Sequence, residues 1–139
     1  MNCTFFGHSD TPQGIMDTLK EKITQLIEKR DVNCFYVGNH GNFDRMVLSV
    51  LKELSGIYPI EYYVVYAYLP KQGEDFSHTI FPEGIETVPK RFAINFRNKW
   101  LIENSDIVIT FVQRSYGGAA QFKKLAENKG KEIINIVQL

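Results

Sequence analysis

The 139-residue chain is long enough for one domain, and its 44% hydrophobic and 13% aromatic content can build a core without disulfides or bound metal. Lys plus Arg and Asp plus Glu number 16 each, so the net charge of zero argues against a protein that coats nucleic acid. No apolar run reaches membrane-spanning length, and the first residues lack the features of a signal peptide, so we expect a soluble, cytoplasmic protein with no membrane partner.

The first predicted strand covers residues 3–6 and ends in the loop Gly7-His8-Ser9-Asp10. Thr11 is typical of an N-cap, and Pro12 of the first helical position. The predicted helix that follows carries apolar side chains at spacings of three and four, which mark one buried face: Ile15, Met16, Leu19, Ile23, Leu26 and Ile27.

Residues 34–37 form the second predicted strand, which leads into the glycine-bearing turn of residues 38–44. A second helix follows and stops near Ser55-Gly56, with Met46, Val47, Val50, Leu51 and Leu54 facing inward. Residues 62–67 form the third strand. The cysteines at positions 3 and 34 both fall in strands and fit no zinc-binding spacing, so we expect buried, reduced thiols.

The alternation of strands and helices then lapses between Tyr68 and Pro89, where prolines and glycines accumulate. A loop of this length in a compact domain is usually functional or mobile. We therefore expect the segment from Lys71 to Val88 to form a lid or rim over a ligand pocket.

Helical pattern resumes at about Arg91, and a β-branched run over residues 107–112 reads as a strand buried on both faces. Gly117-Gly118 and a helical segment follow, and residues 131–137 form the last strand. The sequence predicts a single α/β, Rossmann-like domain over residues 1–139. Its sheet has five mainly parallel strands in the order 3-2-1-4-5, with helices on both faces.

In this order the first and fourth strands are neighbours at the switch point, where open α/β sheets bind ligands. Two glycine-bearing loops then face one crevice. From the first loop we take Gly7, His8 and Ser9 as candidate ligand contacts, although the histidine could equally be a polar cap. The loop after the second strand offers Gly38, Asn39 and Gly41, which could contact a base or a ribose or could be a plain turn.

The loop after the fourth strand gives four further candidates: Ser115, Gly117, Gly118 and Ala119. Small residues at a helix N-terminus let an anion reach unpaired N–H groups, although a glycine pair can also be only a tight loop. Arg97 and Asn98 precede this strand and suit a phosphate, unless they lie on a solvated helix face. Asp44 could cap the second helix instead of binding anything.

Neither full phosphate-binding fingerprint, GxGxxG or GxxxxGK[ST], occurs, and no catalytic triad can be argued from spacing. Several separated blocks nevertheless resemble the YpsA-like branch of the SLOG superfamily, which joins the DNA-processing protein DprA/Smf with the LOG phosphoribohydrolases. The blocks are Thr4-Phe-Phe-Gly-His8, Phe35-Tyr-Val-Gly-Asn39, Gly41-Asn-Phe-Asp-Arg45, Tyr68-Leu-Pro70, Arg91-Phe-Ala-Ile94, Arg97-Asn98, Ser105-Asp106 and Tyr116-Gly-Gly-Ala-Ala120. The resemblance implies a Rossmann-like sheet with a pocket for a nucleotide or a nucleotide-derived ligand.

The sequence differs from the SLOG proteins at several positions of their motifs. Ser9 stands where they often have arginine. Laid over the LOG motif PGGxGTxxE, the chain has Tyr116 for Pro, Ala120 for the third Gly, Gln121 for Thr and Lys124 for the catalytic Glu. Arg97 matches the LOG arginine. The resemblance thus leaves Arg97 as the one catalytic candidate and makes inherited phosphoribohydrolase activity doubtful.

We therefore expect a binding module or sensor for a nucleotide-like small molecule, with no metal and no cofactor other than that ligand. The alternative is a LOG-like hydrolase with a relocated acid such as Glu83 or Glu86. A DprA-like contact with single-stranded DNA is a third, weaker hypothesis, which the neutral charge disfavours. The sequence leaves the question of a homodimer open.

Overall fold

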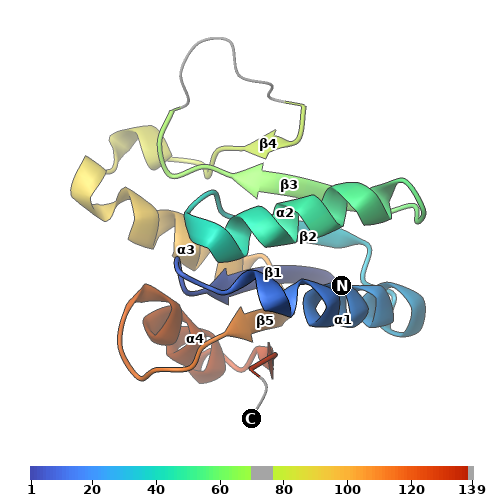
Figure 1. The fold of residues 1–139 in the computed structure, drawn as a ribbon. Coiled ribbons are helices and arrows are strands. Elements are labelled where there is room, and N and C mark those ends of the chain that lie inside the picture. Colours follow the sequence, from blue (N-terminus) through green and yellow to red (C-terminus); the bar gives the residue numbers. More distant parts are fainter. Residues whose placement is uncertain (70–76, 138–139) are drawn as a thin grey trace.

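The computed structural model describes residues 1–69 and 77–137, which form one α/β domain. Six parallel strands lie in the order β4-β3-β2-β1-β5-β6 (Figure 1). The strands are β1 (Asn2–Gly7), β2 (Cys34–Val37), β3 (Glu61–Val65), β4 (Thr79–Ile80), β5 (Ile107–Phe111) and β6 (Glu132–Asn135). The α-helices are α1 (Met16–Arg30), α2 (Gly41–Ser55), α3 (Ala93–Glu103) and α4 (Gly118–Asn128).

The predicted arrangement of strands is confirmed, because the five expected strands take the order 3-2-1-4-5 within this sheet. The number five is wrong. Residues 79–80 add a short parallel strand beside β3, in the segment that we expected to be a loop. Two residues among prolines and glycines carry no alternating pattern, so this strand depends on β3 as its template.

Helices cover both faces of the sheet, as expected. Helices α1 and α2 lie on one face, in front in Figure 1, while α3 and α4 lie on the other. The first core contains Phe5, Phe35, Leu19 and Leu51, all less than 2% exposed. The second core joins side chains from β1, β3, β5, α3 and α4: Phe6, Val65, Val108, Leu101, Ile102, Phe122 and Ala126.

Strand β1 pairs with β2 on one side and with β5 on the other, from Cys3 opposite Ile107 to Gly7 opposite Phe111. The chain leaves β1 towards α1 and β5 towards α4, which cover opposite faces. The sheet thus has its switch point between β1 and β5, and the loops after these strands meet there.

The start of the first helix differs from the prediction. Thr11 is buried, and its hydroxyl donates to the carbonyl of His8 at 2.5 Å instead of capping a helix. Pro12 precedes a 3-10 turn, Gln13–Ile15, and α1 begins only at Met16. The threonine therefore closes the β1 loop on itself.

Other 3-10 turns lie at Ile85–Thr87 and Lys90–Phe92, before α3. Ile85 packs with Ala67 and Ala93 in a small third cluster. The expected lid begins at Lys71, and its part up to residue 76 lies outside the described residues. No helix in the described ranges is both long and apolar enough to cross a bilayer.

Candidate functional site

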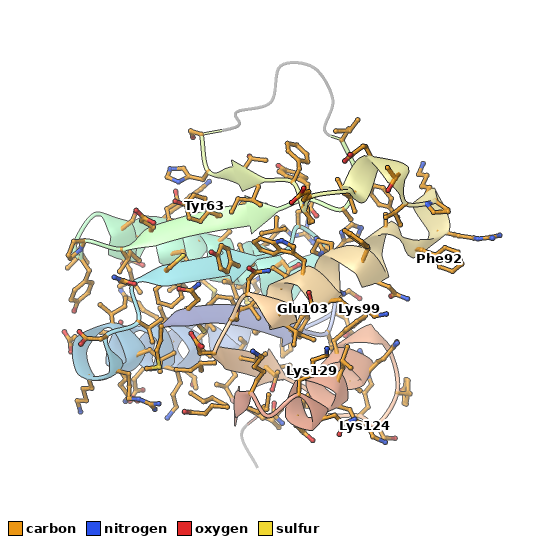
Figure 2. The ribbon with its side chains drawn as sticks, turned by 180° about the vertical axis from the view of Figure 1, so that it is seen from behind. Tyr63, Phe92, Lys99, Glu103, Lys124 and Lys129 are labelled. Atoms are coloured by element: carbon orange, nitrogen blue, oxygen red, sulfur yellow. The ribbon has the colours of Figure 1, made fainter. Side chains whose placement is uncertain are left out.

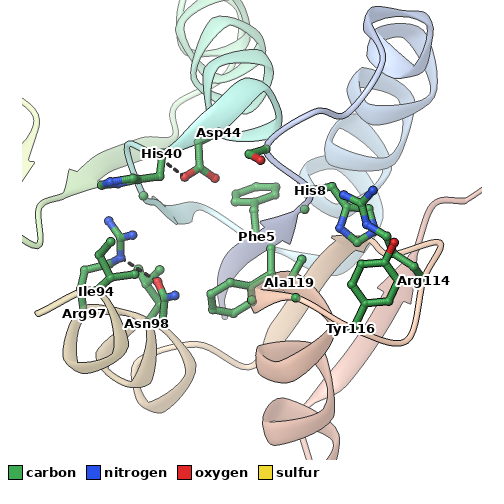
Figure 3. A pocket seen from close by; sticks show the side chains of 17 residues that line it. Phe5, His8, His40, Asp44, Ile94, Arg97, Asn98, Arg114, Tyr116 and Ala119 are labelled. Carbon is green, nitrogen blue, oxygen red and sulfur yellow. Dashed lines mark hydrogen bonds between the residues drawn. The ribbon is translucent and has the colours of Figure 1, made fainter. Parts of the chain in front are cut away.

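A pocket of about 300 Å³ opens at the carboxyl ends of β1, β2 and β5, at the switch point (Figure 3). Phe5 and Phe6 of β1 line it, together with residues of α3 and of the N-terminus of α4. Its lining residues are Phe5, Phe6, Gly7, His8, Ser9, Gly38, His40, Asp44, Ile94, Arg97, Asn98, Leu101, Arg114, Tyr116, Gly117, Gly118 and Ala119. A volume of this size fits a small polar metabolite.

The N-terminus of α4 contributes uncapped backbone to this pocket. Gly117 is the N-cap with φ of +93°, a conformation that L side chains rarely adopt, and no side chain caps the helix. A Cβ on Gly118 would meet nothing within 4 Å, and the φ of Gly118 is not in the left-handed region. The first N–H groups of α4 thus have no side-chain cap, and the small residues around them let an anion approach.

Arg97 comes from α3 and is only 2% exposed. Its Nε donates to Asn98 Oδ1 at 2.7 Å, and its Nη1 donates to the carbonyl of Val65 at 2.9 Å and to Asn39 Oδ1 at 3.2 Å. Burial lowers the pKa of the guanidinium, against the opposing effect of the nearby Asp44 carboxylate. Within the described residues Nη2 has no hydrogen-bond partner, so one donor edge of a buried cation remains free in the pocket wall.

Asp44 stands on the first turn of α2 and accepts the N–H of His40 at 2.9 Å through Oδ2. The N-cap of α2 is His40 and not Asp44; the aspartate lies inside the first turn, where it binds the N–H of the N-cap residue and also lines the pocket. Withdrawal from bulk water raises the pKa of the carboxyl to about 6, against the lowering effects of the His40 N–H and of Arg97. Perturbed carboxyls in a cleft are typical of functional sites.

Gly38 lies between these two charged groups. A Cβ at this position would be 2.9 Å from both Arg97 Nη1 and Asp44 Oδ2. With any larger residue at position 38, the guanidinium or the carboxylate would have to move away from the end of β2. The requirement is steric, and no positive φ is involved.

His8 has a structural role inside the pocket wall. It is 6% exposed, and its Nε2 accepts the backbone N–H of Gln113 at 3.0 Å, which ties the β1 loop to the β5 loop. An accepting Nε2 requires the neutral ring with its proton on Nδ1. Burial, aided by Arg114, lowers the pKa of His8, while Asp10 opposes the shift.

This hydrogen bond predicts a pH effect on stability. The folded state lowers the pKa of His8, so the unfolded chain binds the proton more readily, and the free energy of unfolding should fall as pH drops below about 6.5. His8→Gln keeps a side-chain acceptor without titrating. The stability advantage of wild type over His8→Gln, measured by urea unfolding from pH 5 to 8, should shrink on the acid side, because only wild type loses stability there. A constant difference would contradict the assigned tautomer.

One side of the pocket mouth is formed by an exposed ion pair. Arg114, from the β5 loop, donates to Asp10 Oδ1 at 2.7 Å, and its guanidinium lies 5.6 Å from the ring centre of Tyr116. The aspartate lies in the β1 loop, so this pair joins the same two loops as the His8 contact. The hydrogen bond to Arg114 lowers the pKa of Asp10. Arg114 is thus a second cation near the α4 N-terminus.

Nine of the twelve candidate residues line the pocket: Gly7, His8, Ser9, Gly38, Arg97, Asn98, Gly117, Gly118 and Ala119. The other three do not. Asn39 supports Arg97 from outside. Gly41 has φ of +85° and packs its backbone against Ser9, where a Cβ would be 2.6 Å from the Cα. Ser115 is exposed, and its neighbours Arg114 and Tyr116 line the pocket instead.

The hydrolase alternative placed its acid at Glu83 or Glu86, but both are exposed and neither lines the pocket. Lys124, at the position of the LOG glutamate, is exposed further along α4 and borders a separate groove with Lys99 (Figure 2). A glutamate at 124 would therefore not complete this pocket. The carboxylate that the structure places there is Asp44, which sequence reasoning treated only as a cap.

The signal for Asp44 was available in the sequence, because it follows a glycine-bearing loop at the carboxyl end of a strand. Its approach to Arg97 joins positions far apart in the chain and depends on the packing of α3 against the sheet. Among the residues that the structure describes, no group of three or more His, Cys, Asp or Glu side chains could hold a metal ion.

Comparison of the sequence with protein-family models and with curated proteins gave no match in either case.

Proposed function

We propose that this protein is a binding module or sensor for a nucleotide or nucleotide-derived ligand, which it holds in the pocket between the β1 and β5 loops. The observation that carries the proposal is the uncapped N-terminus of α4, with Gly117 in the left-handed region and open space around Gly118, inside a pocket that also contains Arg97. The ligand's phosphate occupies the helix N-terminus. The resemblance to SLOG proteins supports a nucleotide over other phosphorylated molecules.

Charge distribution supports an anion at this end of the pocket. The helix N-terminus carries a partial positive charge, and the Arg114 guanidinium lies at the same side (Figure 3). Arg114 needs only to exchange an exposed carboxylate, Asp10, for a phosphate oxygen. Because an exposed pair contributes little to stability, that exchange is not opposed by a large energy.

Calorimetric titration of the wild type with AMP, GMP and inorganic phosphate tests the proposal. We expect the nucleotides to bind and phosphate to compete with them for the same site. Arg114→Gln should weaken both by about three- to tenfold, as expected for one partly exposed charge-assisted hydrogen bond. Failure of all three probes to bind the wild type would refute the nucleotide proposal.

A second candidate function, hydrolysis of a nucleoside monophosphate, is favoured by one observation: Asp44 and Arg97 face the same pocket. In this proposal the Asp44 carboxylate takes a proton from water and the water oxygen bonds to C1′. The C–N bond breaks, its electron pair goes to the base nitrogen, and that nitrogen takes up the proton held by Asp44. Release of free base from AMP or GMP, measured by chromatography, decides between the candidates. Binding without turnover favours the sensor.

The cellular location is also part of the proposal. Cys3 is buried, Cys34 is half-buried, and both are free thiols. Free thiols in neighbouring strands suit a reducing compartment, and nucleotides abound in the cytoplasm. We therefore propose a cytoplasmic protein.

A further inference from the structure

The end of the pocket away from Arg114 holds a pair of opposite charges that do not touch. Arg97 Nη1 and Asp44 Oδ2 both lie 2.9 Å from the point where a Cβ would stand on Gly38, so they are separated by at most twice that distance. Among residues 1–69 and 77–137, neither side chain takes part in a direct ion pair. Figure 3 shows them on the same side of Phe5, across from Tyr116.

The two groups still have hydrogen-bonding capacity. Asp44 Oδ2 accepts the His40 N–H, whereas Asp44 Oδ1 has no hydrogen-bond partner within the described residues. Arg97 Nη2 is likewise unpartnered although the side chain is 2% exposed. Asn98 gives its oxygen to Arg97 Nε, which leaves its amide N–H₂ for the pocket. The subsite therefore offers one acceptor and two donors.

We propose that Asp44, Arg97 and Asn98 form a subsite for the vicinal diol of a ribose, so that the pocket distinguishes ribonucleotides from deoxyribonucleotides. This inference rests on the proposed function, because the phosphate of the same ligand occupies the α4 N-terminus. A sugar hydroxyl donates and accepts at once. It can donate to the carboxylate and accept from the guanidinium or the amide, which a methylene at C2′ cannot do.

The charges of the pocket favour the same orientation of the ligand, with its ribose beside Asp44 and its phosphate at the α4 N-terminus. Asp44 repels a phosphate from its end of the pocket, while Arg114 and the helix N-terminus attract one at the other end. A neutral, hydroxyl-rich group is the part of a nucleotide that fits beside a carboxylate. The edge of a purine base also carries hydrogen-bond donors and acceptors, so the experiment distinguishes binding of the ribose from binding of the base.

The test is calorimetric titration of wild type and Asp44→Asn with AMP, 2′-deoxy-AMP, GMP, 2′-deoxy-GMP and inorganic phosphate. Asparagine keeps an oxygen for the His40 N–H and presents a donor where Oδ1 accepts. In the wild type, AMP and GMP should each bind about tenfold tighter than their deoxy forms, the discrimination expected from an unmatched polar pocket group. Asp44→Asn should remove this preference, and inorganic phosphate should bind it at least as tightly as it binds wild type, because the variant lacks the repelling carboxylate.

Gly38→Ala gives an independent variant, since its methyl group would fill the space between the two charged groups. We expect it also to lose the ribose preference, and thermal unfolding reports whether it remains folded. Equal affinity of the wild type for ribo and deoxy forms would overturn the diol assignment while leaving the phosphate site standing. If Asp44→Asn changes the relative affinity for AMP and GMP, but not the difference between ribo and deoxy forms, the subsite binds the base. Absence of binding by every probe, phosphate included, would refute the proposed function together with this inference.

The preference should also depend on pH. Only the ionised carboxylate accepts both hydrogen bonds, so the ribo-to-deoxy ratio should fall below about pH 6, where Asp44 binds a proton in the free protein. Other ionisable groups facing this region are His40, His8, Arg97, Arg114 and Tyr116. Burial lowers the pKa values of both histidines, which moves their titration to the acid side of its ordinary range, and the ratio cancels ionisation of the ligand's phosphate. A ratio constant from pH 5 to 8 would contradict an accepting role for Asp44.

Discussion

Gly118→Asp is expected to weaken nucleotide binding by about 30- to 1000-fold, or roughly 2–4 kcal/mol, because it places a carboxylate where the phosphate should lie. The empty protein should keep its stability. Gly118 is outside the left-handed region, and a side chain there would enter open space. An acidic residue in the first turn of a helix even interacts favourably with the helix dipole. Calorimetric titration with AMP, together with thermal unfolding of the ligand-free variant, measures both effects.

Two controls separate charge from size and location. Gly118→Ala adds a small group to the same open space and should lose much less affinity. Lys124→Glu also adds negative charge to α4, but it lies in the separate groove with Lys99, so AMP binding should stay close to wild type. If Gly118→Asp binds AMP as tightly as wild type does, the phosphate is not at this helix.

Arg97→Met should be the most destabilising change in the pocket, at about 2–4 kcal/mol near pH 8, because it leaves buried acceptors and the Asp44 carboxylate without their cation. Methionine has a similar length and avoids a large cavity. The loss should be smaller at pH 5. Without Arg97 the pKa of Asp44 rises further above its ordinary value, so the folded state is stabilised where the carboxyl is protonated and destabilised as pH rises.

Urea unfolding at pH 5 and pH 8 measures this difference. Asp44→Asn in the Arg97→Met background should recover part of the stability at pH 8, because it removes the unpaired charge. A double-mutant cycle with the two single variants then gives the coupling between the groups. Equal destabilisation at both pH values, with no recovery in the double variant, would show that the two side chains act independently in the empty protein.

Much of the fold was predictable because its elements have strong local patterns. Helix α2 repeats apolar residues on one face, and β5 is buried at each of its five positions, which matches its β-branched run. The errors lie where local pattern is weak. Thr11 and Pro12 match an N-cap signature, yet the Thr11 hydroxyl binds the carbonyl of His8 three residues earlier, and α1 begins only at Met16. Strand β4 exists only because β3 offers an open edge.

The residues of the candidate site were likewise predictable only where a local pattern restricts which residue fits. Glycines at strand ends and at the start of α4 mark the pocket from sequence, because turns and close backbone approach restrict which residues fit. Within a loop, the sequence does not indicate which side chains face the pocket. Ser115 was therefore predicted as a ligand contact, whereas its neighbours Arg114 and Tyr116 line the pocket. Side chains in an irregular loop do not alternate with a fixed period, so their direction cannot be inferred from the sequence.

By itself, the sequence determined the parallel sheet, the order of its five expected strands and the two loops that meet at the switch point, because hydrophobic periodicity and right-handed crossovers act through local rules. Only the tertiary structure decided that Arg97 would be buried, that His8 would bind a backbone amide, and that Asp44 would face Arg97 across Gly38. Those contacts join residues from different loops and helices. Their charges and pKa values depend on burial between packed elements, a property that no single stretch of sequence carries.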